Sequence, residues 1–552
     1  MKNVQKNALI SVYNKNGIVE FVQGLIILGY KIFSSGGTAK KLMEAGIEVT
    51  DVATLVGGGA ILGHRVVTIS RELHAGLLAN KLSETDMQEL QELGLHCFDL
   101  VCVDCYPLKE EVVNPSATLE SVIEKTDIGG PLMIRSGAKG NRIVVCDFRD
   151  RMAVLEWLKA GCPDEETFIN GLAAKAEAYV SAYVLTSAMY RGNGKYYGFI
   201  GEKTHDLRYG ENPWQKSLGL FETFGGSNDP LALSKFKVIS GQFGHVNWID
   251  LDRKLQTMTH IMAGYYKNRL WQDMGIGTTS GKEPCIALGV KHGNCCGAAL
   301  ASTSIQALAD MIDGNHLSIF GGAVITNFPV TKELAEMLIH FHSGSGKRLL
   351  DVIVAPSITE EALEVLKRKN DACKMAVNPA LEHLGPDCLD KEPLMRKVRG
   401  GVLVQQNYDF VLDLDADHVK RYASIPKCFG QEKIDTVLAW AVCATSNSNT
   451  ITLVKNGMLI GNGVGQQDRK ECCELAIKRA QEAGHLTKGG VACSDSFFPF
   501  PDGPETLIAA GVKNIFSLSG SVNDKLTIAL CEKENISLTL IPNTEGRMFF
   551  GH

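Results

Sequence analysis

A lysine and a histidine stand side by side at Lys291 and His292, between an apolar run and a polar, Gly-rich segment. The apolar run at 286–290 predicts a strand, so the pair lies at a strand's carboxyl end, where α/β proteins collect their ligands. Imidazole titrates near neutrality and can carry a proton, and a neighbouring ammonium group can stabilise an oxyanion. The pair alone fits both a catalytic site and a solvated surface.

The turn Ser34-Ser-Gly-Gly-Thr38 offers a place for an anion. It follows a predicted strand at 31–33 and precedes a predicted helix, so its glycines let the backbone approach a ligand and the first N–H groups of the helix point at it. Ser11, at the end of an earlier predicted strand, and Lys15 add a hydroxyl and a charge. The same pattern also fits a plain turn in which Thr38 caps the helix.

Two more segments carry dense polar groups. Arg208 lies in Leu-Arg-Tyr-Gly-Glu-Asn-Pro, where a planar guanidinium could clamp a phosphate, although a surface loop also fits. Asp127 precedes Ile-Gly-Gly-Pro, and Lys139 follows on the same segment. Together with Tyr106, these residues could handle protons beside the anion-binding turn.

The composition of the chain limits the kinds of partner that it can bind. The chain has 552 residues, with 56 Lys+Arg and 62 Asp+Glu, a formal net charge of −6. This mild acidity gives no basic stripe, which argues against nucleic-acid and membrane-surface partners. The 16 cysteines are too dilute for a disulfide scaffold, and no apolar run reaches the ~18–20 residues of a membrane helix. The start lacks the apolar core of a secretory signal, so we expect a soluble, cytoplasmic protein.

Short apolar runs alternate with helix-period segments along the chain, which predicts an α/β protein with parallel strands. A turn-rich break, Arg191-Gly-Asn-Gly194, follows a long predicted helix at 164–189 and marks a boundary near residue 200. The remaining length suits two α/β subdomains. We therefore expect domains at 1–200, 201–390 and 391–552.

Six motifs occur in one fixed order along the chain. They are Ser-Gly-Gly-Thr at 35–38, Tyr106-Pro107, Asp127-Ile-Gly-Gly130, Leu207-Arg-Tyr-Gly-Glu-Asn-Pro213, Lys291-His-Gly-Asn-Cys-Cys-Gly-Ala-Ala299 and Ser494-Asp-Ser-Phe-Phe-Pro-Phe500. With these motifs in register, the sequence resembles the bifunctional purine-biosynthesis family AICAR transformylase/IMP cyclohydrolase across essentially its whole length.

The resemblance implies an α/β fold class, with an N-terminal methylglyoxal-synthase-like Rossmann-type domain followed by two cytidine-deaminase-like α/β subdomains. The zinc signature of deaminases is absent, since Pro284-Cys285 has no cysteine three residues on. We therefore expect the deaminase-like fold without a catalytic metal. The resemblance admits a structural potassium ion.

For the second part of the chain, the resemblance implies formyl transfer from the co-substrate 10-formyltetrahydrofolate to AICAR, which gives FAICAR. His292 would accept or shuttle the amine proton, Lys291 would stabilise charge, and Asn449 would hold the formyl oxygen or orient His292. Transformylase sites of this family are assembled across a homodimer. The substrate-binding residues implied for this site are Arg208, Tyr209, Gly321, Asp351, Phe497, Pro499, Asp502 and Arg547.

For the first domain, the resemblance implies cyclodehydration of FAICAR to IMP. Tyr106, Asp127 and Lys139 would act on the base. The residues implied for the phosphate end are Ser11, Lys15, Ser35, Gly36, Gly37, Thr38, Arg65 and Thr68.

One segment departs from the family's pattern. The family usually reads Gly-Gly-Arg-Val-Lys-Thr-Leu-His-Pro, whereas this chain reads Gly63-His-Arg-Val-Val-Thr-Ile-Ser-Arg71, so Val67 replaces the catalytic lysine. An apolar side chain cannot donate a proton or stabilise an oxyanion, so we expect a weakened cyclohydrolase unless His64 substitutes. The alternative is a non-catalytic regulatory protein that binds a nucleotide or phosphorylated metabolite, which would not require the groups implied for formyl transfer.

Overall fold

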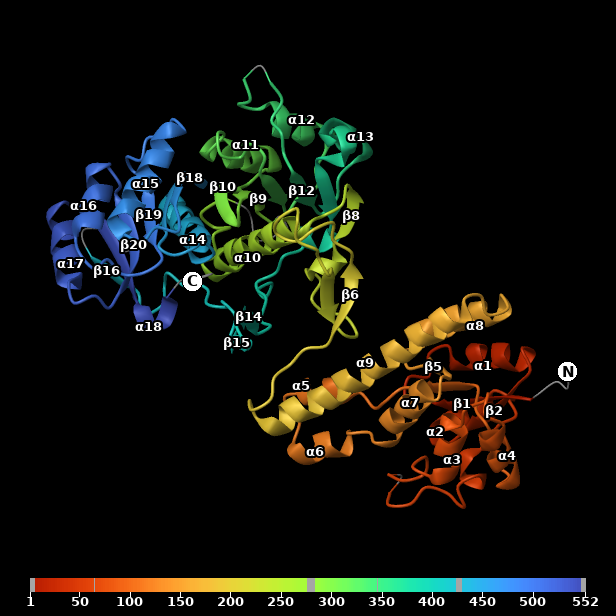
Figure 1. Ribbon diagram of the computed structural model, residues 1–552. Coiled ribbons are helices and arrows are strands. Elements are labelled where there is room, and N and C mark those ends of the chain that lie inside the picture. The colour runs from red at the N-terminus through yellow and green to blue at the C-terminus, as the bar shows by residue number, and fades with distance from the viewer. Residues whose placement is uncertain (1–4, 64, 276–282, 345, 423–428, 548–552) are drawn as a thin grey trace. The chain divides into compact units, whose positions relative to one another are not determined.

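The computed structural model describes residues 5–63, 65–275, 283–344, 346–422 and 429–547. Contacts within the chain form two compact units (Figure 1). Unit 1 comprises Met1–Glu202 and Phe221–Gly226, and unit 2 comprises Lys203–Leu220 and Ser227–His552. A two-stranded sheet of β6 (Gly201–His205) and β7 (Leu220–Thr223) spans the residues at which the chain changes unit.

Unit 1 is built on a five-stranded parallel sheet in the order β3-β2-β1-β4-β5. Successive residues of β1 enter different cores, since Ala8 and Ile10 lie in one hydrophobic cluster and Leu9 in another. Such two-sided burial is typical of parallel strands covered by helices on both faces. The strands are β1 (Lys6–Ser11), β2 (Tyr30–Ser34), β3 (Thr50–Asp51), β4 (Leu100–Val103) and β5 (Ile143–Val145).

The helices of unit 1 supply the two covering layers. The first, α1 (Ile18–Ile27), buries Ile18, Phe21, Val22 and Leu25, whose spacing places them on one helical face. The others are α2 (Gly36–Glu44), α3 (Arg71–Leu78), α4 (Glu84–Glu92), α5 (Leu108–Val113), α6 (Leu119–Glu124), α7 (Gly129–Lys139), α8 (Arg151–Lys159) and α9 (Glu165–Gly192).

Unit 2 is built on a twelve-stranded mixed sheet in the order β16-β21-β20-β19-β17-β18-β10-β9-β11-β12-β13-β8. The strands are β8 (Lys237–Ser240), β9 (Cys285–Lys291), β10 (Asn294–Ala301), β11 (Ala323–Thr326), β12 (Val352–Ala355), β13 (Lys374–Val377), β16 (Lys420–Tyr422), β17 (Ile451–Lys455), β18 (Met458–Gly463), β19 (Val491–Ser494), β20 (Asn514–Ser519) and β21 (Ser537–Pro542).

This sheet contains one arrangement twice. In β10-β9-β11-β12-β13 and in β18-β17-β19-β20-β21, an antiparallel hairpin is followed by an antiparallel neighbour and then by two parallel steps. A long helix precedes each hairpin, α10 (His245–Lys267) in the first copy and α14 (Gly430–Ala444) in the second. The strands β10 and β18 pair antiparallel and join the copies into one sheet.

The two long helices lie in the core of unit 2, and α14 buries all of 434–444. Shorter helices cover the rest of the sheet. They are α11 (Ser304–Gly314), α12 (Lys332–His340), α13 (Glu360–Leu366), α15 (Arg469–Glu482), α16 (Asp502–Ala509), α17 (Asp524–Lys533) and α18 (Asn543–Gly546).

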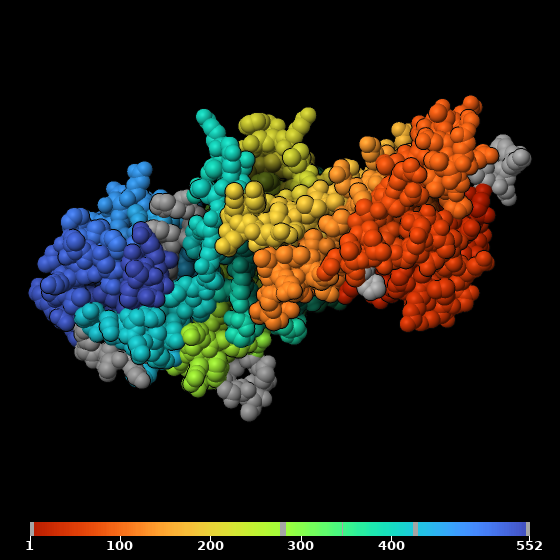
Figure 2. All heavy atoms as spheres, turned by 90° about the horizontal axis from the view of Figure 1, so that it is seen from below, coloured from red at the N-terminus to blue at the C-terminus, as the bar shows by residue number. Residues whose placement is uncertain are grey.

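A separate hairpin of β14 (Leu394–Val398) and β15 (Gly401–Gln405) lies between the two copies in sequence. Most of its residues are exposed on both strands, and Figure 2 shows it as a teal ridge. Within the described residues, none of the helices is long and apolar enough to cross a membrane.

Candidate active sites

One edge of the unit 2 sheet collects most residues expected to carry formyl transfer. β9 ends at this edge, and β11 and β12 begin there because β11 runs antiparallel to β9. β17 also begins there, whereas β19, β20 and β21 end there. The first repeat therefore presents its hairpin turn at this edge, and the second repeat presents its hairpin turn at the opposite edge.

His292 and Gly293 form the two-residue turn between β9 and β10, with φ of 53° and 73°. Positive φ at both positions is characteristic of a type I′ hairpin. The N–H of Gly293 donates to Asp250 Oδ1 at 2.9 Å, and Asn294 Nδ2 donates to the His292 carbonyl oxygen at 3.1 Å. The backbone under His292 is fixed, while its imidazole is exposed.

Lys291 is held beside a neighbouring loop. Its Nζ donates to the carbonyl oxygen of Phe320 at 2.9 Å. Gly321 follows with φ of 70°, and the N–H of Asp351 donates to the Gly322 carbonyl oxygen at 3.0 Å. The structure thus brings Lys291, Gly321 and Asp351 together at the edge.

Two buried charges lie behind the His292 turn, one helical turn apart on α10. Lys254 is 0% exposed, and its Nζ has no hydrogen-bond partner among the described residues. Burial lowers the pKa of Lys254 to about 8, against the opposing attraction of Asp250. Burial also raises the pKa of Asp250, while Lys254, the Gly293 N–H and His292 favour its charged form. Lys254 therefore helps to keep the carboxylate beneath the turn ionised.

The amide of Asn449 is fully engaged within the chain. Its Nδ2 donates to the carbonyl oxygens of Gln466 at 2.8 Å and Gln467 at 3.2 Å, and its Oδ1 accepts from Arg469 Nη2 at 2.6 Å. In this conformation Asn449 has no amide hydrogen left for a formyl oxygen, which is one of the two roles expected for it; the orienting role stays a prediction. Asn449 fixes the 466–467 segment instead.

The segment around Asn449 is also tied to the His292 hairpin. The N–H of Asn447 donates to Asn294 Oδ1 at 3.2 Å. On the other side, the fully buried carboxylate of Asp495 accepts from Ser448 Oγ at 2.5 Å. The two repeats are therefore hydrogen-bonded to one another at this edge.

The predicted aromatic segment follows β19. Phe497 is half-buried, and the exposed Pro499 accepts a hydrogen bond at its carbonyl oxygen from Asn523 Nδ2 at 2.7 Å. Asp502 is the first residue of α16 and accepts from the N–H of Gly503 at 2.8 Å. Arg547 lies just after α18 and is exposed.

Arg208 and Tyr209 lie near the start of α10. A Cβ placed on Gly244, the N-cap of α10, would lie 3.7 Å from the Tyr209 ring. The Arg208 side chain is exposed and makes no ion pair within the part of the chain that the structure describes. A free guanidinium near a helix N-terminus suits a phosphate group.

The predicted residues divide into two groups along the edge. From the end of β9 to the start of β17 there are three strand spacings, roughly 14 Å. From β9 to the end of β21, next to Arg547, there are six spacings, roughly 29 Å. One nucleotide cannot reach across both groups, so one chain does not gather all of them around a single substrate.

In unit 1, the anion-binding turn leads into α2. Its N-cap, Ser35, makes no side-chain capping bond, and Gly36 has φ of 53°, which favours glycine. Gly36 and Gly37 are exposed in the first turn of α2. Thr38 differs, because its Oγ1 accepts from the Val12 N–H at 3.1 Å and donates to the Val12 carbonyl oxygen at 3.0 Å. Its hydroxyl ties α2 to β1 instead of facing a ligand.

Ser11 and Lys15 flank the same turn. Ser11 is half-buried at the end of β1. The Lys15 Nζ donates to the carbonyl oxygens of Val12 and Tyr13. Burial lowers the pKa of Lys15, and the carboxylate of Asp104 opposes this shift. The cation is thus held close to the carboxyl end of β1.

Tyr106, Asp127 and Thr68 share one place beside the start of α7. Asp127 Oδ1 accepts from the Gly130 N–H at 3.0 Å, yet burial raises the pKa of this carboxyl. Burial also raises the pKa of Tyr106, and the charge of Asp127 adds to the shift. A Cβ on Gly129 would lie 2.5 Å from Thr68 Oγ1, so a larger residue there would displace the Thr68 side chain. These groups can exchange protons with a bound base.

Lys139 and Arg65 were also predicted for this site. Lys139 lies apart from Asp127, and Arg65 is already paired with Glu124. Lys139 ends α7, ten residues after Gly129, which places it roughly 15 Å along the helix from Asp127. The structure does not bring Lys139 to Asp127 within one chain. Arg65 forms an exposed ion pair with Glu124 at 2.7 Å, so it must change partner to bind a phosphate.

In segment 63–71, which departs from the family's pattern, the structure accounts for one residue, Ser70. Ser70 caps α3, since its Oγ accepts from the Leu73 N–H at 3.2 Å. Val67 is half-buried and supplies no charge. His64, the substitute considered for the missing lysine, lies outside the described residues.

Sequence reasoning missed Asp250 and Lys254, although an internal signal points to Asp250. The dipeptide Ile-Asp occurs in both long helices, at 249–250 and 434–435. Asp435 accepts from the N–H groups of Asn456 at 2.9 Å and Gly457 at 2.6 Å in the second hairpin turn, as Asp250 does from Gly293 in the first. Pairing Ile-Asp with the later Lys-x-Gly turn would have found this support.

Comparisons with known proteins agree over nearly the whole chain. Residues 139–479 match the family described as AICARFT/IMPCHase bienzyme, and residues 17–132 match the MGS-like domain. A bifunctional purine biosynthesis protein PurH from Thermoanaerobacter sp. (strain X514) is 35% identical, covering 97% of this chain and 98% of its own. The PurH of Anoxybacillus flavithermus is 34% identical with the same coverage.

A solved structure, titled crystal structure of ForH, is 33% identical over 34% of this chain and 98% of its own, with a TM-score of 0.31. The family match spans more than half of the chain, and the PurH relatives exceed 30% identity over almost all of it. The chain therefore belongs to the AICARFT/IMPCHase bienzyme family.

Proposed function

We propose that this bifunctional purine-biosynthesis enzyme forms FAICAR from AICAR and 10-formyltetrahydrofolate at the Lys291–His292 turn, and closes FAICAR to IMP at the carboxyl edge of the unit 1 sheet. The observation that carries the proposal is the construction of the turn. Asp250 fixes its backbone and the Phe320 carbonyl holds Lys291, while His292 stays exposed. The regulatory alternative has no use for such a device.

Formyl transfer needs a proton acceptor because the AICAR amine is a weak nucleophile. Its nitrogen attacks the formyl carbon, and His292 takes the proton as the new C–N bond forms. Lys291 stabilises the oxyanion of the tetrahedral intermediate. The bond from the formyl carbon to N10 then breaks, N10 takes a proton, and tetrahydrofolate leaves. Asn449 acts as a positioning residue, through its bonds to the 466–467 segment.

The active assembly is a homodimer. The spread of the predicted residues along the sheet edge supports this, because a second chain can bring one group against the other. In this arrangement Arg208 and Tyr209 hold the phosphate. The partner chain supplies the remaining contacts to nucleotide and folate from Phe497, Pro499, Asp502 and Arg547. The division into domains at 1–200, 201–390 and 391–552 stays a prediction, which the separate unit 1 and the repeated strand order of unit 2 support.

Ring closure in unit 1 is intramolecular, so positioning and proton transfer suffice. Gly36, Gly37 and Lys15 bind the phosphate, and Asp127 and Tyr106 move protons at the base. Burial raises the pKa of both groups, and such shifts are typical of residues that move protons. The half-buried Val67 supplies no cation, so we propose that ring closure is the slower reaction.

The family acts on small molecules, AICAR and a formyl folate. We propose that neither reaction uses a catalytic metal, that a structural potassium ion accompanies the fold, and that the protein works in the cytoplasm without nucleic-acid or membrane partners.

The experiment for the proposed function measures tetrahydrofolate release from 10-formyltetrahydrofolate. Release that depends on AICAR supports formyl transfer. AICAR binding without release would support the regulatory alternative.

A further inference from the structure

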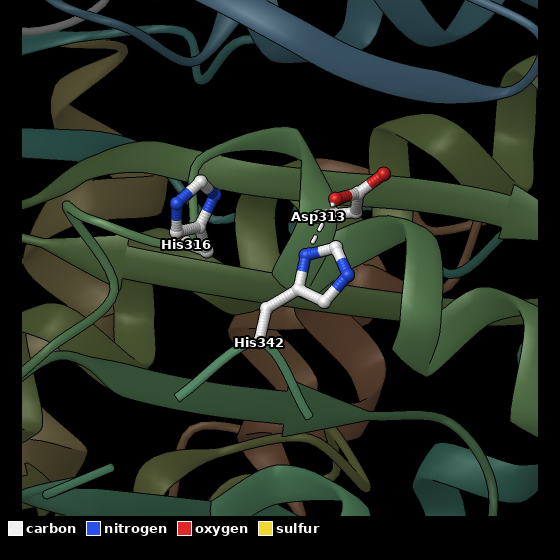
Figure 3. A group of neighbouring side chains, drawn as sticks. All are labelled: Asp313, His316 and His342. Carbon is white, nitrogen blue, oxygen red and sulfur yellow. Dashed lines mark ion pairs between the residues drawn. The ribbon is translucent and has the colours of Figure 1, made fainter. Parts of the chain in front are cut away.

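A second group of chemically active side chains lies away from the proposed active sites (Figure 3). Asp313 is in the last turn of α11, His316 follows that helix, and His342 follows α12. One ligand atom from each lies within 4.8 Å of the others. His342 Nδ1 lies 2.9 Å from Asp313 Oδ1, and the two imidazole rings meet edge to face at 5.8 Å between centroids.

Two imidazoles and one carboxylate are a ligand set that zinc and related divalent transition metals favour. Zinc binds such atoms at ~2.0–2.2 Å, so its ligand atoms lie roughly 3.3 Å apart. Side-chain rotations of about an ångström would bring the three atoms from their present separations to that spacing. A water molecule would complete the tetrahedron, as in zinc sites with three protein ligands.

One nitrogen of the cluster is buried and unpaired within the described residues, which favours a metal ion as its partner. His316 Nδ1 is buried and has no hydrogen-bond partner within the described residues. Figure 3 shows a ring nitrogen of His316 turned towards Asp313. Buried polar atoms are almost always paired, and a bound cation would pair this one. His485 Nε2 lies 2.9 Å from the Asp313 carbonyl oxygen and steadies the end of α11.

We infer that Asp313, His316 and His342 bind one divalent transition-metal ion, with zinc as the preferred ion. The site fastens the loop after α11 to the end of α12. The carbonyl oxygen of Asn315 accepts from the N–H groups of Ser318 at 3.2 Å and Ile319 at 3.3 Å, so the start of this loop is a compact turn.

The site has a consequence for Lys291. The loop that His316 would anchor continues to Phe320, whose carbonyl oxygen holds the Lys291 ammonium group at 2.9 Å. An ion at the cluster therefore restricts the segment that orients Lys291. It takes no part in the chemistry of formyl transfer.

Metal binding is tested on the full-length protein after treatment with a chelator. Zn²⁺ is titrated against a chromophoric competitor, and bound metal is counted by mass spectrometry. We expect the wild type to bind one zinc ion per chain. His316→Gln and His342→Gln should each bind zinc at least tenfold more weakly. His340→Gln is the matched control. His340 is the last residue of α12, two positions before His342, but its imidazole pairs with Glu336 at 3.4 Å.

Two further readouts separate this site from adventitious binding by thiols. Cobalt in the site should give a spectrum without the thiolate charge-transfer band. Zinc should slow amide hydrogen exchange at least tenfold in peptides covering 315–322 of the wild type, but not of His342→Gln. Zinc binding equal in His316→Gln, His342→Gln and His340→Gln, or a thiolate band with cobalt, would overturn the inference.

Discussion

Replacing Lys254 by methionine should stabilise unit 2 and slow formyl transfer at the same time. Burial lowers the pKa of Lys254 from 10.5 to about 8, a shift of 10.5 − 8 = 2.5. At 1.36 kcal/mol for each unit, the folded state bears a cost of about 3 kcal/mol for the protonated amine. Methionine has a similar length and no charge, so it removes that cost.

The sign of the pH dependence follows from the lowered pKa. Below pH 8, Lys254 is protonated in both the folded and the unfolded chain, and the wild type bears the whole cost. Between pH 8 and 10.5 the folded chain loses the proton first, so its stability rises with pH. The free energy of unfolding of Lys254→Met should thus exceed that of the wild type by about 3 kcal/mol at pH 7, and the difference should shrink towards pH 10.5.

Urea unfolding followed by tryptophan fluorescence measures this difference, and four of the five tryptophans lie in unit 2. Lys267→Met is the matched control on α10, because Lys267 is 51% exposed and pairs with Asp413 at 3.2 Å. Its effect should stay within about 0.5 kcal/mol. Equal or lower stability of Lys254→Met at pH 7, or a difference that does not shrink with pH, would show that the buried ammonium group does not destabilise the folded chain.

The same substitution should reduce activity through Asp250. Without the ammonium group, the pKa of Asp250 rises further, and its bond to the Gly293 N–H weakens as the carboxylate takes a proton. The kcat of formyl transfer should therefore fall more at the acidic end of the pH profile than at the alkaline end, while AICAR affinity changes little. An unchanged pH profile would show that Lys254 does not act through Asp250.

Three other predictions concern the proposed sites. His292→Ala should lower the kcat of formyl transfer by at least ~10²-fold while AICAR binding, measured by calorimetry, stays within about tenfold, and a fully active variant would remove His292 from the mechanism. Val67→Lys should raise the rate of FAICAR cyclisation by about 10²-fold, and an unchanged rate would show that the missing cation does not limit this reaction. Equimolar, randomly mixed His292→Ala and Arg547→Ala chains should recover about a quarter of the wild-type transformylase activity, because half of the dimers are mixed and each has one intact site. No recovery would place both residues in one chain's site.

Much of the fold follows from local patterns. The apolar runs and the helical face of 18–25 specify β1, α1 and β2, because burial dictates residue type on each face. The family resemblance, and not any local pattern, predicts two similar subdomains in unit 2. The duplication is a property of strand order and direction, and the two hairpin turns share only a lysine and a glycine in Lys291-His-Gly and Lys455-Asn-Gly.

Sequence motifs predicted the residue types of the transformylase site but not the contacts of its side chains. Motifs identified the exposed groups such as His292, whose chemistry is evident from residue type. They could not show that the amide of Asn449 is used within the chain, or that a helix separates Lys139 from Asp127. Motifs could not identify Lys254 either, because its sequence context does not reveal that its ammonium group is buried with no hydrogen-bond partner among the described residues.

The most direct test supplies the purified protein with AICAR and 10-formyltetrahydrofolate labelled in the formyl carbon, and resolves the products over time. We expect the label to enter FAICAR first, FAICAR to accumulate, and labelled IMP to follow more slowly because Val67 leaves ring closure without its cation. Label in neither product would contradict the assignment of formyl transfer to this chain.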